Sequence, residues 1–359
     1  MKVSLVCGAH YEGAEAHLQR PPVPPARCDP VIAAQSFDHY LSYAALADEL
    51  GFDWVSVSEH HYSPLILAPS VAPLAGALTQ IVKRARLALL GPLASVNNPV
   101  RLAEEIAMLD QLSHGRLIVL PLRGSPSEFN VYGPQPVSDT QPRTQEAARL
   151  IRKALSDPET FAWDGEYFHY PTVSVWPRAV QQPYPPMYFS GNSPTSAAFA
   201  AAEHLGVCLS FHPASYVGET FRSYLRATAD HGWQPTPDQL VYRNFVVVAD
   251  TDARADEIEA NFLGPGQRGL LRGPTPDGSS ANGHANTPSA APGHIFFAGG
   301  PDRVVERIRA FHAETGAGVI DLIFSGGQTP PEDVRHSIEL FGREVLPRIR
   351  ELAPVEATA

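Results

Sequence analysis

Residues 37–57 read FDHYLSYAALADELGFDWVSV. Up to Ala47 the apolar residues recur three or four positions apart, which is the spacing of one face of a helix. Gly51 then ends the helix, because glycine takes the left-handed conformation of a C-terminal cap without strain. The apolar run 52–57 follows directly and is typical of a buried strand. The stretch therefore predicts a helix that leads into a strand of a parallel sheet.

The same alternation of strand and helix continues along the chain, with further helical segments at 144–155, 216–229, 302–314 and 332–352. Seven more apolar runs have strand length: 1–9, 87–90, 116–120, 187–190, 207–211, 240–248 and 318–324. Together with 52–57 they make eight, the number that closes a (β/α)8 barrel, whereas a doubly wound open sheet rarely needs so many. We therefore predict an α/β fold in which residues 1–359 form a single TIM barrel.

Two segments interrupt this pattern. Residues 161–168 place aromatic side chains on both sides of Asp164-Gly165, which predicts an inserted β-hairpin. Residues 264–293 are rich in glycine and proline and almost free of apolar side chains, so they cannot belong to the core. Because this segment follows the seventh strand and its helix, we expect a long flexible loop at the C-terminal face of the barrel. It is either a lid or a passive surface insertion.

The composition excludes several classes of protein. The chain has 27 Lys and Arg against 38 Asp and Glu, and the net charge of -11 makes nucleic acid and membrane surfaces poor partners. Cys7, Cys28 and Cys208 lie far apart without a CxxC motif, so neither a disulfide framework nor a thiolate zinc site is expected. The most apolar stretch after the first strand, 87–96, is about half the length of a transmembrane helix. A cytoplasmic protein fits these features best.

The strand 52–57 is followed by Glu59, His60 and His61, at the barrel end where catalytic groups gather. Neighbouring side chains in an extended segment point apart, and no HxH or HExxH motif accompanies them, so we expect no metal. Two interpretations stay open for these histidines. One of them acts as a proton donor or acceptor in a pocket, which we favour, or both are satisfied in the wall and at the rim.

Two other strand ends carry donors for an anion. Arg123 follows the strand 116–120 and brings a guanidinium to the mouth of the barrel. After the strand 187–190, Ser193 is a natural N-cap before a helix that starts with proline, and Ser196 lies in its first turn. A capped helix start and an arginine from the preceding strand together favour a phosphate ligand. Gly91, after a third strand, allows either the approach of a flat ligand or a simple turn.

Several segments resemble the bacterial luciferase-like family of flavin monooxygenases. They are 50–53, 59–61, 98–105, 109–113, 115–117, 123–126, 186–196 and 201–206, and they occur in the order and spacing of the family. The resemblance covers roughly residues 37–210 and is weaker over the last eighty residues. It implies a barrel that binds reduced FMN (FMNH2) from a separate flavin reductase. This flavin would react with O2 through a C4a-(hydro)peroxyflavin and oxygenate a small organic substrate.

The resemblance also implies roles for individual residues. His60 matches the first histidine of the family's Glu-His-His, which assists the oxygen chemistry, and Arg123 matches the arginine that binds the flavin phosphate. Ser193 and Ser196 match hydroxyls of the same phosphate site. Asn192 stands where luciferase has an acidic residue whose contact is made largely by the backbone. Gly91 falls at an unusual backbone bend beneath the flavin ring, whereas Leu122 replaces the reactive cysteine of luciferase, which argues against light emission.

Alternative functions stay open on the same fold. A deazaflavin (F420)-dependent hydride-transfer enzyme would use the same phosphate site, and a non-catalytic flavin-binding protein would keep it without the chemistry. A metal-dependent hydrolase is disfavoured by the ligand count. The resemblance also implies a homodimer, with 102–112 as the contact. The substrate, the choice between nucleophilic and electrophilic oxygenation, and the roles of His10 and His61 are left undetermined by the sequence.

Overall fold

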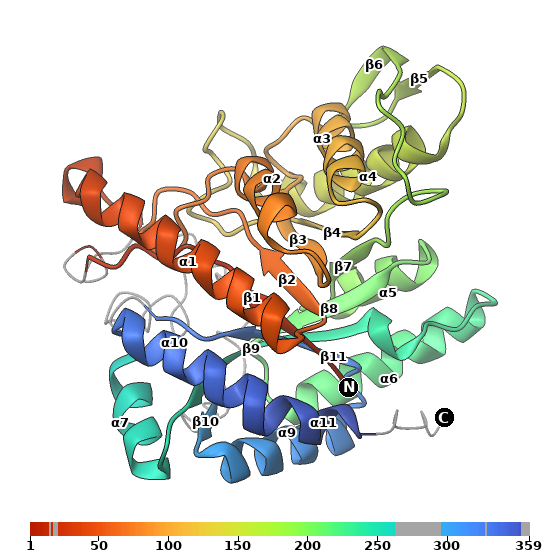
Figure 1. Cartoon of the computed structure of the whole chain (residues 1–359). Coiled ribbons are helices and arrows are strands. Elements are labelled where there is room, and N and C mark those ends of the chain that lie inside the picture. The colour runs from red at the N-terminus through yellow and green to blue at the C-terminus, as the bar shows by residue number, and fades with distance from the viewer. Residues whose placement is uncertain (14–15, 17–20, 263–295, 327–328, 353–359) are drawn as a thin grey trace.

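The computed structural model describes residues 1–13, 16, 21–262, 296–326 and 329–352 (Figure 1). Eight of its parallel strands form one continuous path, in the order β4-β3-β2-β1-β11-β9-β8-β7, and β10 pairs with β9 beside it. The strands are β1 Lys2–Val6, β2 Trp54–Val57, β3 Arg86–Leu93, β4 Leu117–Leu122, β7 Tyr188–Ser190, β8 Gly206–Ser210, β9 Leu240–Val248, β10 Phe296–Gly299 and β11 Val319–Ile323.

The two ends of this path meet. Val119 in β4 forms a parallel bridge with Met187 beside β7, and the Val119 amide donates to the Pro186 carbonyl at 3.0 Å. On the other side β1 pairs with both β2 and β11. The sheet is therefore a nearly closed barrel, and the prediction of a TIM barrel is confirmed.

Helices connect successive strands and pack outside them. They are α1 Pro30–Leu50, α2 Val71–Ile81, α3 Pro99–Leu112, α4 Val137–Ser156, α5 Pro194–Ala202, α6 Ala214–Asp230, α7 Asp252–Phe262, α9 Pro301–Thr315, α10 Pro331–Leu340 and α11 Leu346–Arg350. Several start with the predicted chemistry of a polar cap followed by proline, for example Asn98-Pro99 and Ser193-Pro194. Helices α1 and α10 lie side by side (Figure 1). None of the described helices is long and apolar enough to cross a membrane.

Side chains alternate between two apolar layers along each strand. In β2, Trp54 faces the barrel interior with Ala88 and Ile118 of the neighbouring strands, whereas Val55 packs in the layer between sheet and helices with Leu87. This period of two is set by the pleat of the strand. The lower interior is therefore filled by side chains, and a ligand site is left only at the ends of the strands.

Three expectations outside the barrel strands have different outcomes. The predicted hairpin is confirmed, since β5 Phe161–Asp164 and β6 His169–Val173 pair antiparallel and stand out beyond α3 and α4 (Figure 1). The predicted helix 332–352 is confirmed over most of its length, and the π-helical turn Phe341–Val345 divides it into α10 and α11. In this turn Gly342 packs directly on α1, where a Cβ atom would lie 2.7 Å from Leu50 Cδ1. The predicted loop 264–293 lies outside the described residues.

Candidate active site

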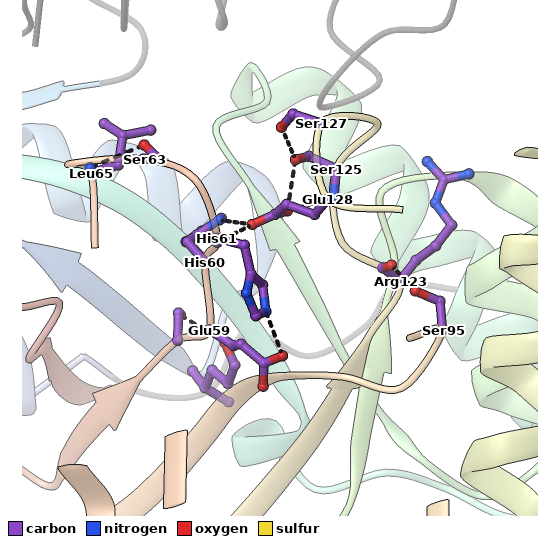
Figure 2. Close-up of polar contacts among 12 residues, drawn as sticks. Glu59, His60, His61, Ser63, Leu65, Ser95, Arg123, Ser125, Ser127 and Glu128 are labelled. Carbon is purple, nitrogen blue, oxygen red and sulfur yellow. Dashed lines mark hydrogen bonds and ion pairs between the residues drawn. The ribbon is translucent and has the colours of Figure 1, made fainter. Parts of the chain in front are cut away.

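His60 is held by a carboxylate from a distant part of the chain. It follows the end of β2, and its Nδ1 atom lies 2.9 Å from Oε1 of Glu128, which belongs to the loop after β4 (Figure 2). Because β3 lies between β2 and β4 in the sheet, this contact crosses the mouth of the barrel above one strand. The His60 side chain is 36 % exposed, whereas that of Glu128 is 2 % exposed. The imidazole therefore presents its other ring nitrogen, Nε2, from a fixed position.

Glu128 has four close polar contacts and is the anchor of this region. Its Oε1 atom also accepts the backbone N–H of His61 at 2.9 Å, and its Oε2 atom accepts the backbone N–H and the hydroxyl of Ser125 at 2.8 and 2.6 Å. A buried carboxylate is stable only when such donors replace water. Glu128 thus ties the loop after β2 to the loop after β4.

The pair shifts the pKa of both partners toward the charged form. Burial by itself would raise the pKa of the Glu128 carboxyl, but His60, Ser125 and the His61 amide together lower that pKa to about 2. Burial likewise opposes the charged form of His60, yet the charge and hydrogen bond of Glu128 outweigh it and raise the pKa of His60 above its ordinary value of 6.5. At a given pH near neutrality, more of His60 is therefore protonated than of a free histidine.

His61 and Glu59 form a second, more buried pair beneath the first. His61 Nε2 lies 3.1 Å from Glu59 Oε1, which also accepts a hydrogen bond from the Asn97 side chain at 2.8 Å. Both side chains of the pair are about 5 % exposed or less. Of the two adjacent histidines, His60 is the one that reaches the opening and His61 is the one held in the wall.

Gly91 lies directly against this segment. Its φ angle is +149°, and a Cβ atom there would come within 3.1 Å of Ser58 Cα and of the Glu59 amide nitrogen. The Gly91 carbonyl also accepts the Glu59 N–H at 3.2 Å. Only glycine fits such a close approach of two backbones, so the residue shapes the floor of the mouth next to the histidines.

Arg123 brings an unpaired positive charge to the site. Its side chain points away from the His60–Glu128 pair (Figure 2), and its guanidinium carbon lies 5.4 Å from the centre of the Phe129 ring. Among the described residues none forms an ion pair with this guanidinium or accepts a hydrogen bond from it. Burial lowers the pKa of the Arg123 guanidinium, and no carboxylate offsets that effect. A partly buried cation without a partner is the natural receptor for an anion.

The start of α5 supplies hydroxyl groups at the same height in the barrel. Ser193 Oγ accepts the Ser196 N–H at 3.3 Å and lies 3.1 Å from Thr195 Oγ1 and 2.9 Å from Ser196 Oγ. The bridge between Val119 and Met187 aligns the two strands, so that Arg123 and Gly191, each four residues later, stand at the same level. The donors predicted for a phosphate therefore follow neighbouring strands.

Asn192 has a structural contact instead of a free side chain. Its Oδ1 atom accepts the Ser210 N–H at 2.9 Å, and its backbone carbonyl accepts the Tyr216 hydroxyl at 3.2 Å. The residue thus joins the ends of β7 and β8 and fixes the loop from which α5 starts. This leaves the backbone of that loop as the part that can contact a ligand.

His10 is buried in the wall beyond the end of β1. Its Nδ1 atom lies 3.2 Å from the Tyr40 hydroxyl and 3.3 Å from the Ser325 hydroxyl. A histidine that shares one ring nitrogen between two hydroxyls is well suited to a wall position. In the described part of the chain, no group of three His, Cys, Asp or Glu side chains is arranged to hold a metal.

A model of one protein family covers most of the chain. The model of the luciferase-like monooxygenase family matches residues 14–318. The chain belongs to this family. Luciferase-like monooxygenases are oxidoreductases, and the relatives of this chain include flavin-dependent monooxygenases.

Curated relatives match the chain over part of their length. The chain is 34% identical over 195 residues to the uncharacterized protein y4wF of Sinorhizobium fredii, which covers 53% of this chain and 56% of that protein. It is 23% identical over 265 residues to the alkanal monooxygenase alpha chain of Photobacterium leiognathi, covering 73% and 70% of the two chains. It is 25% identical over 233 residues to the oxygenase component of the flavin-dependent trigonelline monooxygenase of Acinetobacter baylyi, covering 64% of each.

Solved structures match almost the whole chain. The monooxygenase RslO1 of Streptomyces bottropensis has a TM-score of 0.80 and 26% identity, covering 97% of this chain and 99% of that chain. The oxygenating constituent of 3,6-diketocamphane monooxygenase of Pseudomonas putida, solved with FMN, has a TM-score of 0.76 and 23% identity, covering 99% of each. An F420-dependent secondary alcohol dehydrogenase has a TM-score of 0.72 and 19% identity, covering 98% and 99%. At 23% and 19% identity, the diketocamphane monooxygenase and the F420-dependent dehydrogenase show that the fold is shared, and no more.

Glu128 is the residue of this luciferase-like site that sequence reasoning missed. It lies 68 residues from its partner His60, and no periodicity links the two positions. A local signal did exist, because Ser125-Pro126-Ser127-Glu128 has the spacing of a capping box, in which the glutamate reaches back to the serine N–H. The structure contains that contact without a helix behind it. This contact with Ser125 holds the Glu128 carboxylate in the position from which it binds His60.

Proposed function

We propose that the chain is the oxygenase component of a two-component flavin-dependent monooxygenase that uses reduced FMN and O2. Two features of the same mouth carry the proposal. Arg123 is partly buried and has no ion-pair or hydrogen-bond partner among the described residues, and His60 is held in place by Glu128. The first group fits a cofactor phosphate and the second fits proton transfer. The names of the trigonelline and diketocamphane enzymes support this function and a separate reductase as a partner.

The cofactor would be held mainly through its phosphate. Arg123 supplies the charge, Ser193 and Ser196 supply hydroxyls, and the first turn of α5 supplies the positive end of a helix dipole. Gly91 keeps side chains away from the place where the flat ring must approach the backbone. When bound, reduced FMN supplies the two electrons that the reduction of O2 requires.

His60 is the catalytic residue in this proposal. Its Nδ1 atom faces Glu128, so Nε2 is the nitrogen that exchanges a proton with the reacting oxygen. The raised pKa of His60 keeps an acidic proton available on Nε2 near neutral pH. Glu128 acts as a positioning residue, because it orients the ring and stabilises the imidazolium without reaching the substrate.

The remaining side of the mouth favours an apolar organic substrate. Phe211, with a φ angle of +58°, stacks on Phe245 at 4.7 Å, and Phe245 stacks on Phe296 at 5.1 Å. Val6 and Ile323 complete this apolar cluster at the ends of β1 and β11. Such a wall recognises a small apolar molecule through contact area, with few polar groups to select it.

The exposed apolar side chains of α3 support a homodimer. Met108 and Leu112 are 48% and 43% exposed, and Val180 and Trp176 on the adjacent segment are 48% and 81% exposed. The Gln111 amide donates to the Arg178 carbonyl at 2.7 Å, which ties that segment to α3. Exposed apolar side chains on two adjacent segments are typical of an interface between protein chains. The three free cysteines support a cytoplasmic location.

A deazaflavin-dependent dehydrogenase is the second candidate function. F420 also carries a phosphate, and the F420-dependent alcohol dehydrogenase has the same fold. In that case Arg123 and the hydroxyls of α5 would serve unchanged, and His60 would exchange the proton of an alcohol or a carbonyl. A protein that binds flavin without chemistry would not need a histidine with a dedicated buried carboxylate, so we place it third.

Anaerobic absorbance titrations with FMN, reduced FMN and F420, followed by exposure to air, distinguish these functions. We expect tight binding of reduced FMN and rapid oxidation in air, and weaker binding of F420. The Arg123→Ala variant is the control for binding at the predicted site. Preferential binding of F420, or a reduced FMN that binds equally well to the variant, would contradict the proposal.

A further inference from the structure

The interior of the barrel contains an arginine whose hydrogen bonds are incomplete. Arg243, in β9, donates from Nε to Asp321 at 2.6 Å and from Nη1 to the Ser58 hydroxyl at 2.8 Å. Its side chain is 11 % exposed and that of Asp321 is 0 % exposed. The remaining nitrogen, Nη2, is buried and has no partner among the described residues. Every other polar atom of this ion pair is used, since Asp321 Oδ1 accepts the Ser56 hydroxyl at 2.7 Å.

A buried ion pair of this kind contributes little to the free energy of unfolding. Desolvation of both charges offsets most of their attraction, and apolar residues of the same volume usually stabilise a core as well or better. A buried N–H without an acceptor adds a further cost. The interior cluster next to it, which includes Trp54, Val241 and Val319, is apolar. The pair is therefore better explained by a ligand than by packing.

The position of Arg243 connects it to the candidate active site. Ser58, which accepts from Nη1, donates its own hydroxyl to the Leu90 carbonyl at 2.8 Å and immediately precedes Glu59 and His60. Gly91 lies against the Ser58 backbone. On the other side the Arg243 carbonyl accepts the N–H of Phe211, which begins the aromatic wall. Arg243 thus lies between the histidine side and the aromatic side, one layer beneath the mouth.

We propose that Arg243 binds the negatively charged edge of the reduced cofactor ring and so makes this site prefer reduced over oxidised flavin. The inference rests on the proposed function, because it takes the ligand to be FMN. At neutral pH the ring of reduced flavin is an anion with its charge on the pyrimidine edge, whereas the oxidised ring is neutral, and charge near that edge tunes the cofactor. A guanidinium stays protonated at any working pH, and its Nη2 donor is the free group that such an edge needs.

The ion pair also explains why the charge stays in place without the cofactor. Asp321 balances Arg243 when no anion is present, and Ser58 fixes the orientation of the guanidinium fork. An incoming anionic ring would gain a donor whose orientation Asp321 and Ser58 already fix, once the side chains that cover Nη2 give way. An oxidised, neutral ring would gain less from the same group, because it lacks the attraction between opposite charges that an anionic ring adds to the hydrogen bond.

The test compares two variants that share one change. Asp321→Asn alone keeps the cation, whereas Arg243→Met with Asp321→Asn removes both charges and avoids a buried unpaired carboxylate. Dissociation constants for FMN and for dithionite-reduced FMN are measured anaerobically for the wild type and both variants, with circular dichroism as the check of folding. We expect Asp321→Asn to keep the preference for reduced FMN or to increase it. In the double variant, the ratio of the dissociation constants of oxidised and reduced FMN should fall at least tenfold. The midpoint potential of the bound flavin should then fall by about 30 mV.

The other outcomes are equally informative. A folded double variant with an unchanged ratio of the two dissociation constants would overturn the role of Arg243, and so would an equal loss in both oxidation states. If the double variant does not fold, Arg243→Lys keeps the charge but loses the Nη2 donor, and it should weaken reduced FMN more than oxidised FMN; equal weakening would again overturn the role. A wild type that binds neither form of FMN would instead refute the proposed function and leave the ion pair without this ligand.

Discussion

The polar side chains on the two sides of the barrel mouth differ in whether they have partners. On the β2 side, His60, His61 and Glu59 are all paired, and Glu128 has four close contacts. On the β4 side, Arg123 has no ion-pair or hydrogen-bond partner among the described residues, although it is partly buried. The first region fixes the geometry of a reactive group in advance, and the second leaves its donors available to a ligand. We expect mutations on the two sides to separate chemistry from binding.

His60→Ala should have the largest effect on turnover. Loss of a positioned proton donor typically costs 10²-fold or more in rate, so substrate oxygenation should fall by about that factor while H2O2 release rises. The dissociation constant of reduced FMN should change by no more than a few fold, because His60 lies away from Arg123 (Figure 2). The measurement is the ratio of product to H2O2 at equal supply of reduced flavin.

A matched control exists on the inserted hairpin. His169 Nδ1 lies 2.7 Å from Asp164 Oδ1, so His169→Ala removes a similar pair far from the mouth. It should leave the ratio unchanged. Normal coupling of O2 to product in the His60 variant would mean that this histidine is structural.

Glu128→Ala should have the largest effect on stability. Several buried donors lose their acceptor at once, and we expect the free energy of unfolding to fall by about 3 kcal/mol. Without the carboxylate the pKa of His60 should also fall, because burial and the charge of Arg243 then lower it against the charge of Glu59 alone. Urea unfolding and NMR titration of the His60 ring measure the two effects.

Glu146 is the matched control for that variant. Its carboxylate accepts the Trp163 indole N–H and three backbone N–H groups of the hairpin, at 2.9 to 3.1 Å. Glu146→Ala should destabilise the protein as well but leave the pKa of His60 where it was. If both variants shift this pKa equally, the pairing of His60 with Glu128 is not its cause.

Arg123→Ala should weaken flavin binding by more than tenfold, the loss of a charge-assisted contact of about 1.5–3 kcal/mol. The stability of the free protein should hardly change or should rise slightly, because an unpaired buried charge is removed. Arg123→Lys keeps the charge without the planar fork, so its flavin affinity should lie between those of the wild type and Arg123→Ala. Fluorescence titration with FMN measures the affinity, and an unchanged constant in Arg123→Ala would remove this residue from the phosphate site.

Ser193→Ala should have a smaller effect on both properties. The loss of the N-cap of α5 should cost about 1 kcal/mol of stability and weaken flavin binding a few fold. Asn98 caps α3 in the same way, through hydrogen bonds from Val100 and Arg101, and Asn98→Ala should cost similar stability with no change in flavin affinity. Equal affinity in both variants would assign Ser193 to capping alone.

The pH dependence of stability should be the smallest effect. The lowered pKa of Glu128 contributes stability above its ordinary value of 4.5, and this contribution is lost as the pH falls toward about 2. The raised pKa of His60 contributes stability below 6.5 that is lost as the pH rises through its folded value. The wild type should therefore exceed His60→Ala in stability most between about pH 4.5 and 6.5. A difference that is constant with pH would contradict the ion pair.

Local patterns in the sequence predicted most of the fold. The helical spacing before Gly51, the apolar run behind it and the Asp164-Gly165 turn each act within a few residues, and the structure contains the helix, the strand and the hairpin that they predict. The capping chemistry of Ser193-Pro194 was equally local and is present. The π-helical turn Phe341–Val345 was not predictable in this way; within it Gly342 packs on Leu50, which belongs to another helix.

The sequence by itself thus determined the barrel, the strand ends at which the site lies, and the identities of His60, Arg123 and Ser193 as candidates. Only the tertiary structure decided which of these groups are paired. Glu128 meets His60 across 68 residues and Arg243 meets Ser58 across 185 residues. The reason is physical: periodicity and capping depend on neighbours along the chain, whereas the charge state and the orientation of a buried side chain depend on the partners that closure of the barrel brings to it.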